Sequence, residues 1–475
     1  MNQKTRDQAQ YEKMTQTPVS KLIISLAIPT TISMLVTSIY NMADTFFVSQ
    51  LGTSATGAVG IVFSLMAIIQ AVGFTLGMGA GSTISRLLGQ QKQKDANIIG
   101  STAFFSALAF GLLLTILGLS FVDGLMDLLG ATSTILPYAR GYAQYILFGA
   151  PIMCASFVLN NILRSEGKAT LSMIGLTLGG VLNIALDPLL IFALNMGISG
   201  AAIATLISQC VSFSILLFCF LSGKSITKLS IRNISRKADP YAQIIKIGFP
   251  SLCRQGLASV ANVALNVNAS VYGDAAVAAM SIVGRVFMFI QSVMLGIGQG
   301  FQPVAGYNYG AAKYDRVRKS YWFTVKAGFL LMTSLCIVGF IFAPQIVSLF
   351  RKDDLEVITI GALAFRAQCV ALPLMSLSIP TNMLMQSTGK SLEATILACA
   401  RQGIFYLPII LILPKMVGLL GVQLAQPLSD ALTLVISSIF LVLFLRKLKV
   451  EEAAQQKTAC SFSYFLFALL TERIA

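Results

Sequence analysis

Long runs of apolar residues alternate with short polar connections along most of the chain. Six runs lie in the first half, at 22–48, 56–82, 97–122, 138–162, 171–195 and 199–222, and six in the second half, at 242–270, 276–303, 320–346, 360–385, 393–414 and 418–445. A helix of roughly 20 apolar residues spans a bilayer. The pattern therefore predicts an all-α integral membrane protein with twelve transmembrane helices.

The second half of the pattern repeats the first at an offset of 221 or 222 residues. Matching segments are LGTSATGAVG (51–60) with YGDAAVAAMS (272–281), RSEGKAT (164–170) with QSTGKSL (386–392), and GISGAAIA (197–204) with GLLGVQLA (418–425). Because each half holds an even number of spans, both halves insert in the same orientation. We expect two six-helix lobes, related by a pseudo-two-fold axis along the membrane normal, with a cleft between them.

These boundaries predict five parts of the chain. They are an N-terminal arm (1–20), an N-lobe (21–222), a basic linker (223–241), a C-lobe (242–445) and a C-terminal tail (446–475). Because the first twenty residues are polar and no small-residue cleavage site follows a short apolar core, we expect no cleavable signal peptide.

Composition and charge support a membrane protein and not a nucleic-acid-binding one. The 475-residue chain is 56% hydrophobic and 11% charged, whereas soluble domains carry about 25% charged residues. The formal net charge of +15 comes from connections on the side of the N-terminus, including Arg164 with Lys168, the 224–237 cluster and Lys390. By the positive-inside rule, both termini are predicted to be cytoplasmic, and the surrounding partner is membrane lipid.

Several chemistries have no signature in this chain. It contains no histidine, which is the commonest metal ligand and proton shuttle. The glycine-rich run at 73–90 lacks the GxxxxGK[ST] pattern of a phosphate-binding loop, so small residues for close helix packing are the better interpretation. We therefore expect neither an enzyme nor an ATPase, no cofactor, and an ion gradient as the source of energy.

Two carboxylates lie inside apolar runs of the first half, Asp44 and Asp187. A carboxylate at mid-bilayer depth costs about 2.5–3.5 kcal/mol on insertion scales, so it should face a cavity or a partner. Asn183 precedes Asp187 by four residues and shares its helix face. We expect the two carboxylates, Asn183 and Thr205 to form one coupling site. Oxygen ligands suit Na⁺, while two adjacent like charges favour sharing a proton. The alternative is that Asp44 only hydrogen-bonds neighbouring helices.

Polar groups near Asp44 extend this hypothesis to a substrate cavity. Tyr40 and Thr37 precede Asp44 by one and two helical turns. With Gln70 and Asn160, they are predicted to line the substrate cavity. Pro29 removes the hydrogen bond to the carbonyl of Ser25, so the first helix is predicted to have a hinge there.

The carboxylate pair is not repeated in the C-lobe, where Asp44 aligns with Leu265 and Asp187 with Ile409. The apolar runs of that half instead carry four arginines: Arg254, Arg285, Arg366 and Arg401. Each either lines a cavity or extends from a helix end to the interface. Asp430 is a candidate partner for one of them.

The sequence resembles the multidrug and toxic compound extrusion (MATE) transporters, in their DinF-like and MepA-like bacterial branch. The resemblance covers residues 15–445. It is carried by Ile28-Pro29 followed by Asp44, by FVSQLGTSATGAVG, by NIALDP (183–188), by GISGAAIAT (197–205) and by the pair LGMGAG and LGIGQG.

This resemblance implies two six-helix lobes that export amphipathic, often cationic and aromatic compounds by alternating access, in exchange for Na⁺ or H⁺. It implies a cation site at Asp44, Asn183, Asp187 and Thr205, with Tyr40 beside it, and bending of the first helix about Pro29. NorM-type members carry an acid in the seventh helix, where this chain has Arg254-Gln255. Ion coupling is therefore expected in the N-lobe alone.

The sequence thus predicts a cation-coupled multidrug efflux antiporter of a bacterial plasma membrane, working as a monomer. A flippase for lipid-linked precursors is the first alternative, because an anionic pyrophosphate cargo would favour the C-lobe arginines. An intramembrane enzyme or a signalling protein is the second alternative, although no nucleophile–base pair or metal-ligand cluster supports it.

Overall fold

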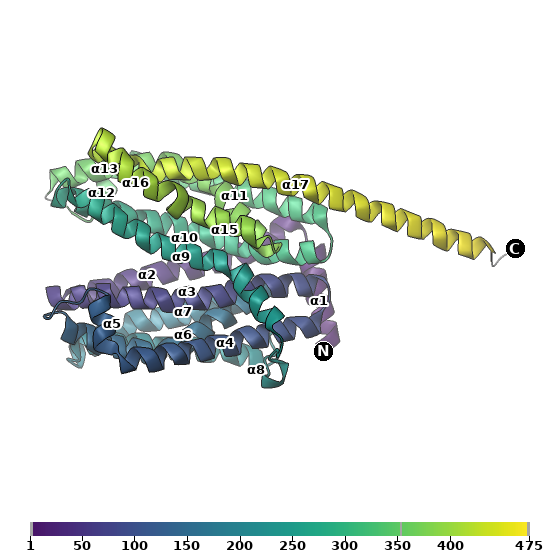
Figure 1. Ribbon diagram of the computed structural model, residues 1–475, viewed down its shortest axis with the longest axis horizontal. Coiled ribbons are helices and arrows are strands. Elements are labelled where there is room, and N and C mark those ends of the chain that lie inside the picture. Colours follow the sequence, from purple (N-terminus) through teal and green to yellow (C-terminus); the bar gives the residue numbers. More distant parts are fainter. Residues whose placement is uncertain (1–2, 352–353, 473–475) are drawn as a thin grey trace.

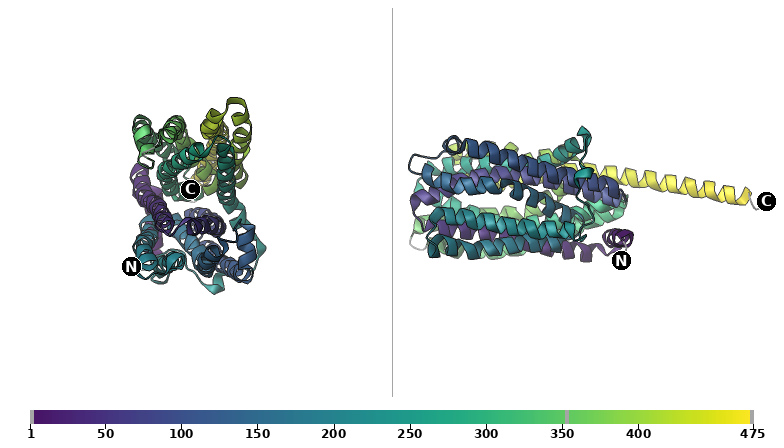
Figure 2. Two further views of the ribbon diagram at one scale, coloured as in Figure 1. Left: turned by 90° about the vertical axis from the view of Figure 1, so that its left-hand side faces the viewer. Right: turned by 90° about the horizontal axis from the view of Figure 1, so that it is seen from below.

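Long helices, nearly parallel, build the whole of the described chain, which comprises residues 3–351 and 354–472 of a computed structural model. No strand occurs in these ranges. The helices form two groups that lie one above the other in Figure 1, and the end-on view in Figure 2 separates the same two groups. Residues 473–475, at the end of the predicted tail, lie outside the described residues.

The first group is the N-lobe, drawn in purple and blue in Figure 1. It follows α1 (Gln3–Gln16) and consists of α2 (Val19–Ser49), α3 (Thr53–Gly89), α4 (Gln93–Ser120), α5 (Val122–Leu128), α6 (Leu136–Ser165), α7 (Ala169–Pro188), the π-helix η1 (Leu189–Ala193) and α8 (Gly197–Leu221).

The second group is the C-lobe, reached through a connection that contains the short 3₁₀ helix η2 (Ile231–Asn233). Its elements are α9 (Ala238–Ser270), α10 (Asp274–Gly310), α11 (Tyr314–Ile341), α12 (Ala343–Ser348), α13 (Leu355–Ala371), the 3₁₀ helix η3 (Leu372–Leu374), α14 (Met375–Ser387), α15 (Ser391–Cys399), the π-helix η4 (Ala400–Phe405), α16 (Tyr406–Val417) and α17 (Leu419–Glu472). Helix α17 continues well beyond the bundle (Figure 1).

Eleven spans in the described residues are long and apolar enough to cross a membrane. Helix α9 is the twelfth predicted span, and its 33 residues are also long enough. Its hydropathy is lowered by Arg254, Gln255 and three asparagines, so composition alone does not mark it. It packs against α3 and α15 inside the bundle, where these polar residues are not all exposed to lipid.

The sequence repeat is also present in the backbone. Six of the eight glycines with positive φ among the described residues form pairs at the repeat offset: Gly52 and Gly273 (φ 110° and 95°), Gly167 and Gly389 (78° and 84°), and Gly197 and Gly418 (57° and 65°). Two of the three described non-glycine residues with positive φ, Gln91 and Ala312 (60° and 54°), form a fourth pair. The loops of the two lobes therefore turn in the same way at matching positions.

Small residues let the lobes approach closely where α3 meets α9 and α2 meets α10. A Cβ on Gly79 would lie 2.0 Å from the carbonyl oxygen of Ile244, and one on Gly248 would lie 1.9 Å from that of Thr75. At the repeat-related contact, a Cβ on Gly300 would lie 2.6 Å from the Cα of Ala27. Only glycine allows this backbone-to-backbone packing.

The lobes are also held together at the end of the bundle where α1 lies, which we call the α1 end. There a Cβ on Gly89 would be 2.2 Å from the carbonyl oxygen of Tyr307, and one on Gly310 would be 2.1 Å from that of Arg86. The final turns of α3 and α10 are therefore in direct contact. The bundle is closed at this end.

Helix α1 contacts both lobes at the α1 end. From the N-lobe side, the carbonyl oxygen of Glu166 accepts a hydrogen bond from Gln10 (2.8 Å). From the C-lobe side, Asn308 donates to the carbonyl oxygen of Met14 at 3.1 Å, and Arg316 donates to that of Thr17 at 2.6 Å. The Met14 side chain is fully buried. The predicted N-terminal arm is thus a docked helix.

The predicted basic linker is likewise fixed to the N-lobe. The Glu166 carboxylate accepts hydrogen bonds from the Ser225 hydroxyl (2.7 Å) and from the backbone N–H groups of Ile226 (2.9 Å) and Thr227 (2.7 Å). Further along, Lys228 N–H donates to Asn97 at 2.8 Å. The linker therefore begins as an ordered segment packed on the N-lobe.

Candidate functional site

Three N-lobe helices bring together the four residues predicted to form the coupling site. Asp44 comes from α2, Asn183 and Asp187 from α7, and Thr205 from α8. All four side chains are buried, with exposed fractions of 5%, 3%, 0% and 5%, respectively. Because α7 packs against both α2 and α8, its polar face is enclosed between them.

Hydrogen bonds hold these side chains in two sets, one around Asn183 and one at Asp44. Asn183 Nδ2 lies 3.2 Å from Asp187 Oδ1 and 3.4 Å from Thr205 Oγ1, and it can donate to both. The first contact follows from the four-residue spacing on a helix. Tyr142 of α6 donates to Asp44 Oδ2 at 3.5 Å. Tyr142 is 1% exposed, and it was not among the residues predicted from the sequence.

Three oxygens of these two sets have no hydrogen-bond partner: Asp44 Oδ1, Asp187 Oδ2 and Asn183 Oδ1. A buried acceptor left unsatisfied costs about 1–3 kcal/mol, and more when it is charged. Each of these atoms accepts hydrogen bonds or coordinates cations, and a carboxylate donates only when protonated. The arrangement therefore suits a bound cation or proton.

The donor set also limits which cation fits. Carboxylate, amide and hydroxyl oxygens suit hard cations. Only two carboxylates are present, and no group of three His, Cys, Asp or Glu side chains that could hold a metal ion occurs in the described residues. Two carboxylates, one amide and one hydroxyl fit a monovalent ion such as Na⁺.

The family of this chain is shown by a sequence match that covers both lobes. A family-level sequence profile, MatE, matches residues 29–189 and 250–412, which is most of both lobes. The chain belongs to the MATE family.

Relatives match along nearly the whole chain. The multidrug export protein MepA from Staphylococcus aureus (strain MSSA476) is 26% identical over 437 residues, which cover 92% of this chain and 96% of that protein. A structure of a multidrug resistance MATE family transporter of the MOP superfamily in an outward-facing conformation has a TM-score of 0.87 and 28% identity, covering 92% of this chain and 98% of that one.

A third similar structure is a MOP superfamily transporter from Pyrococcus furiosus Vc1 (DSM3638), described as having a binding pocket of reverse polarity that suggests a different function. Its TM-score is 0.87 at 28% identity, covering 92% of this chain and 98% of that one. Together these matches show a MepA-like MATE transporter with the two-lobe fold. It is a transporter and not an enzyme.

In this MATE transporter, α7 is followed by a π-helix directly after Asn183 and Asp187, two of the candidate coupling residues. Helix α7 continues through Pro188, and η1 then widens the spiral from Leu189 to Ala193. Gly200 of α8 packs on this segment, because a Cβ there would lie 2.8 Å from the carbonyl carbon of Leu190. Single-turn π segments occur often at functional sites. The wider turn was not predicted from the sequence.

The four residues predicted to line a substrate cavity differ in their surroundings. Tyr40 lies beside the coupling site, since a Cβ on Gly180 of α7 would be 3.2 Å from its ring. Thr37 donates to the carbonyl oxygen of Ser33 at 2.8 Å, and Gln70 is half-buried on α3. Asn160 is buried and donates to Ser172 Oγ at 2.6 Å, so its amide nitrogen links α6 to α7. Their role in substrate binding stays a prediction.

The predicted hinge lies within an unbroken helix. Helix α2 extends from Val19 to Ser49 with Pro29 buried inside it. Next to the proline, Thr30 donates to the carbonyl oxygen of Gly296 in α10 at 2.6 Å. The proline is therefore located where α2 crosses the other lobe, and its role as a hinge stays a prediction.

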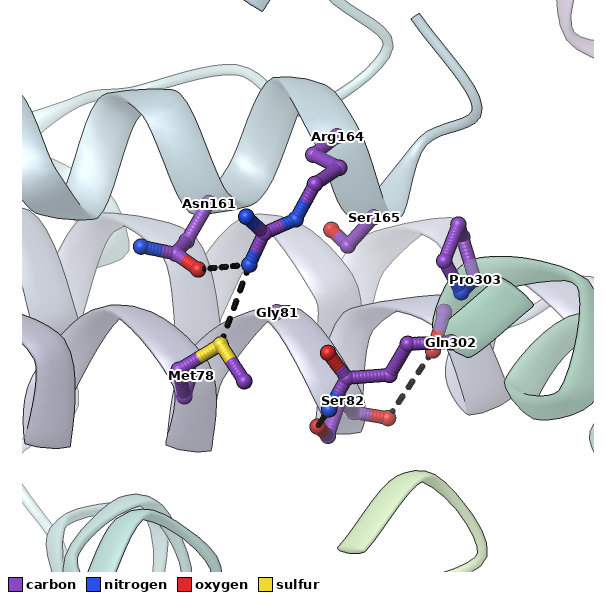
Figure 3. Close-up of a pocket in the computed structure, with 9 residues that line it drawn as sticks. Met78, Gly81, Ser82, Asn161, Arg164, Ser165, Gln302 and Pro303 are labelled. Atoms are coloured by element: carbon purple, nitrogen blue, oxygen red, sulfur yellow. Dashed lines mark hydrogen bonds between the residues drawn. The ribbon is translucent and has the colours of Figure 1, made fainter. Parts of the chain in front are cut away.

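Arg164 does not lie in a loop, where its position in the sequence had placed it. It belongs to the last turn of α6 and is 4% exposed, between the two lobes. Its guanidinium donates to Gln299 Oε1 of α10 (2.5 Å), to Met78 Sδ of α3 (3.0 Å) and to Asn161 Oδ1 (Figure 3). Arg164 therefore no longer belongs to the basic connections near α1 from which the orientation was predicted.

The four arginines in the apolar runs of the C-lobe differ in their contacts and burial. Arg401 pairs with Asp430, with Nε 2.7 Å from Oδ1, which confirms the predicted partnership. Arg366 donates to the carbonyl oxygen of Phe340 at 3.2 Å. Arg254 is half-buried and Arg285 is exposed, and neither forms an ion pair within the described residues.

Proposed function

We propose that this MATE transporter is a multidrug efflux pump that exports amphipathic, often cationic and aromatic compounds in exchange for Na⁺ or H⁺. The observation that carries the proposal is the set of three buried, partnerless oxygens on Asp44, Asn183 and Asp187. The relative MepA, a multidrug export protein, supports the choice of cargo.

The coupling ion would be held by residues of the N-lobe alone. Asp44 and Asp187 would supply negative charge, while Asn183 and Thr205 would supply neutral oxygens. Tyr142 donates to Asp44 and would orient that carboxylate toward the ion. The bound ion would neutralise a site that otherwise attracts cationic drugs. Antiport needs only that ion and drug disfavour each other's binding, and this coupling is reciprocal.

The orientation follows from charge and from the closed end of the bundle. Lys313 lies at the α1 end, where its Nζ donates to the carbonyl oxygen of Thr15 at 3.1 Å, and most basic connections lie on the same side. By the positive-inside rule this end would be cytoplasmic in a bacterial plasma membrane. The closed α1 end would then correspond to an outward-facing state, a reading supported by the similarity to an outward-facing relative.

Purified protein in liposomes tests this proposal by ethidium efflux, with a pH gradient or a Na⁺ gradient imposed separately. Asp44→Asn and Asp187→Asn are compared with Asp123→Asn, an exposed carboxylate whose ion pair with Arg140 has side chains 51% and 53% exposed. We expect one gradient to drive efflux, both site variants to fall to the level of empty liposomes, and Asp123→Asn to transport normally. Wild-type efflux by Asp44→Asn would refute the coupling role.

A flippase for lipid-linked precursors remains the second candidate, favoured by the relative with a pocket of reverse polarity. In this chain the Arg401 charge is neutralised by Asp430, which weakens the case for an anionic cargo in the C-lobe. Well-folded wild-type protein that transports no drug under either gradient, yet restores growth of a flippase-depleted host, would favour this candidate.

A further inference from the structure

A buried positive charge between the lobes has no negative partner in the protein. The three atoms that accept hydrogen bonds from Arg164 belong to Gln299, Asn161 and Met78, and all are neutral. Among the described residues, none of the ion pairs within 4.0 Å involves Arg164.

Such a charge is expensive to bury. Even after relaxation, removing an ion from water costs several kcal/mol, and neutral hydrogen bonds offset only part of this cost. The site is 4% exposed, so bulk solvent provides little screening. An external counter-ion would offset the remainder, provided that space for it exists beside the guanidinium.

A small pocket, with a cavity volume of about 10 Å³, lies beside Arg164 (Figure 3). Its walls come from α3, α6 and α10, and the lining residues are Met78, Gly81, Ser82, Ser85, Asn161, Arg164, Ser165, Gln302 and Pro303. A cavity of roughly 10–15 Å³ on this measure holds about one water molecule. This one is therefore suited to a small ion and not to the exported compounds.

The polar groups of the pocket include a second donor. Gln302 donates to Ser82 Oγ at 3.3 Å, which leaves the Ser82 hydroxyl proton available for another acceptor. A guanidinium has five N–H donors, and three contacts to protein atoms leave Arg164 with donors to spare. Cationic N–H groups and a hydroxyl are the groups that bind anions. Arg164 is the only charged residue in the lining, and none of the lining residues is a carboxylate.

We propose that this pocket binds a small monovalent anion, chloride being the simplest, between Arg164 and Ser82. A monovalent anion would neutralise the single positive charge of the Arg164 guanidinium. Because Gln302 and Pro303 of the C-lobe complete a pocket that is otherwise built by the N-lobe, the anion is held fully only when the lobes are together at the α1 end. Its binding stabilises that closed state.

The test is a thermal melt of the purified protein in detergent. Sodium chloride replaces sodium gluconate stepwise, so that Na⁺ and ionic strength stay constant while a small anion replaces a bulky one. A ligand that binds only the folded state raises the melting temperature with saturation. We expect a saturable rise of a few degrees for the wild type and none for Arg164→Gln. The matched control is Arg366→Gln, whose guanidinium lies against Phe340 outside the pocket, and it should respond like the wild type.

A second measurement does not depend on any variant folding well. Wild-type crystals grown in bromide should show an anomalous peak within hydrogen-bonding distance of the Arg164 guanidinium. Sodium acetate in place of chloride tells whether a carboxylate, such as that of a lipid or substrate, can occupy the same pocket. An equal rise with acetate indicates a site for small anions in general, and a rise with chloride alone indicates a halide site.

Two results would overturn the proposal. An identical chloride response in Arg164→Gln would place the anion effect elsewhere. The absence of both the melting shift and the bromide peak would mean that water fills the pocket. Neither measurement depends on ion-coupled efflux, so failure of the proposed transport function would leave this conclusion intact.

Discussion

The contact between Gly248 and the backbone of α3 offers a direct way to separate the two lobes. In Gly248→Ala the new Cβ would lie 1.9 Å from the carbonyl oxygen of Thr75. The clash is with backbone, so no side chain can rotate away from it. Gly256→Ala is the matched control on the same helix, because no atom lies within 4 Å of its Cβ position.

The size of the effect follows from this geometry. A comfortable contact between a methyl carbon and a carbonyl oxygen is about 3.2–3.5 Å, so the helices must separate by more than about 1 Å at this point. Overpacking of this kind costs roughly 1–3 kcal/mol, which corresponds to a shift of about 5- to 150-fold in an equilibrium constant. Because the strain exists only where the lobes meet, the substitution should favour the state in which they separate.

Cysteine labelling measures this shift. A cysteine introduced at Ser82, which is 3% exposed at the lobe interface, is placed in a background without other reactive thiols. Its reaction with a membrane-impermeant maleimide added on the α1 side should be faster in Gly248→Ala than in the unaltered background, by a factor in the range given above. Gly256→Ala should react at the background rate. Equal rates for all three proteins would show that this contact does not control opening.

Further substitutions test two kinds of interaction within the lobes. Arg401→Gln leaves Asp430 buried without its partner and should lower stability by roughly 3–5 kcal/mol, measured by thermal melts in detergent. Adding Asp430→Asn should restore most of the loss, and an unchanged melt of the single variant would contradict the pairing. Asn160→Ala and Asn382→Ala each remove one link at repeat-related positions, to Ser172 Oγ and to the Ala394 carbonyl oxygen at 2.7 Å. Each should cost about 0.5–1.5 kcal/mol, and a loss in only one of them would argue against equivalent roles.

The fold could be predicted from the sequence because a bilayer imposes few solutions on an apolar chain. Helices must satisfy their own backbone hydrogen bonds in lipid, so each apolar run became a helix, and the repeat offset determined which helices match. The run containing Arg254 shows the limit of this reasoning. Helix α9 is less apolar than the other spans, and although its run was predicted, its packing against α3 and α15 was not.

That the candidate coupling residues lie together was predictable for a related reason. Asp44 and Asp187 stand out because lipid penalises carboxylates, and the spacing of Asn183 gives its helix face. Tyr142 was missed, since a tyrosine in an apolar run gives no sign of which carboxylate its hydroxyl will contact. Arg164 was misplaced because it directly precedes a polar connection, and only the packing of α10 against α6 encloses it.

The position of α1 also constrains how the protein is assembled. This helix is made first, yet its binding surface combines Glu166, which ends α6, with Asn308 and Arg316, which lie about 300 residues later than α1 in the chain. During synthesis α1 therefore cannot dock completely until α10 and the start of α11 have been made. Burial of Met14 then becomes one of the late events of biogenesis, and it can occur only in a molecule whose two lobes have already met.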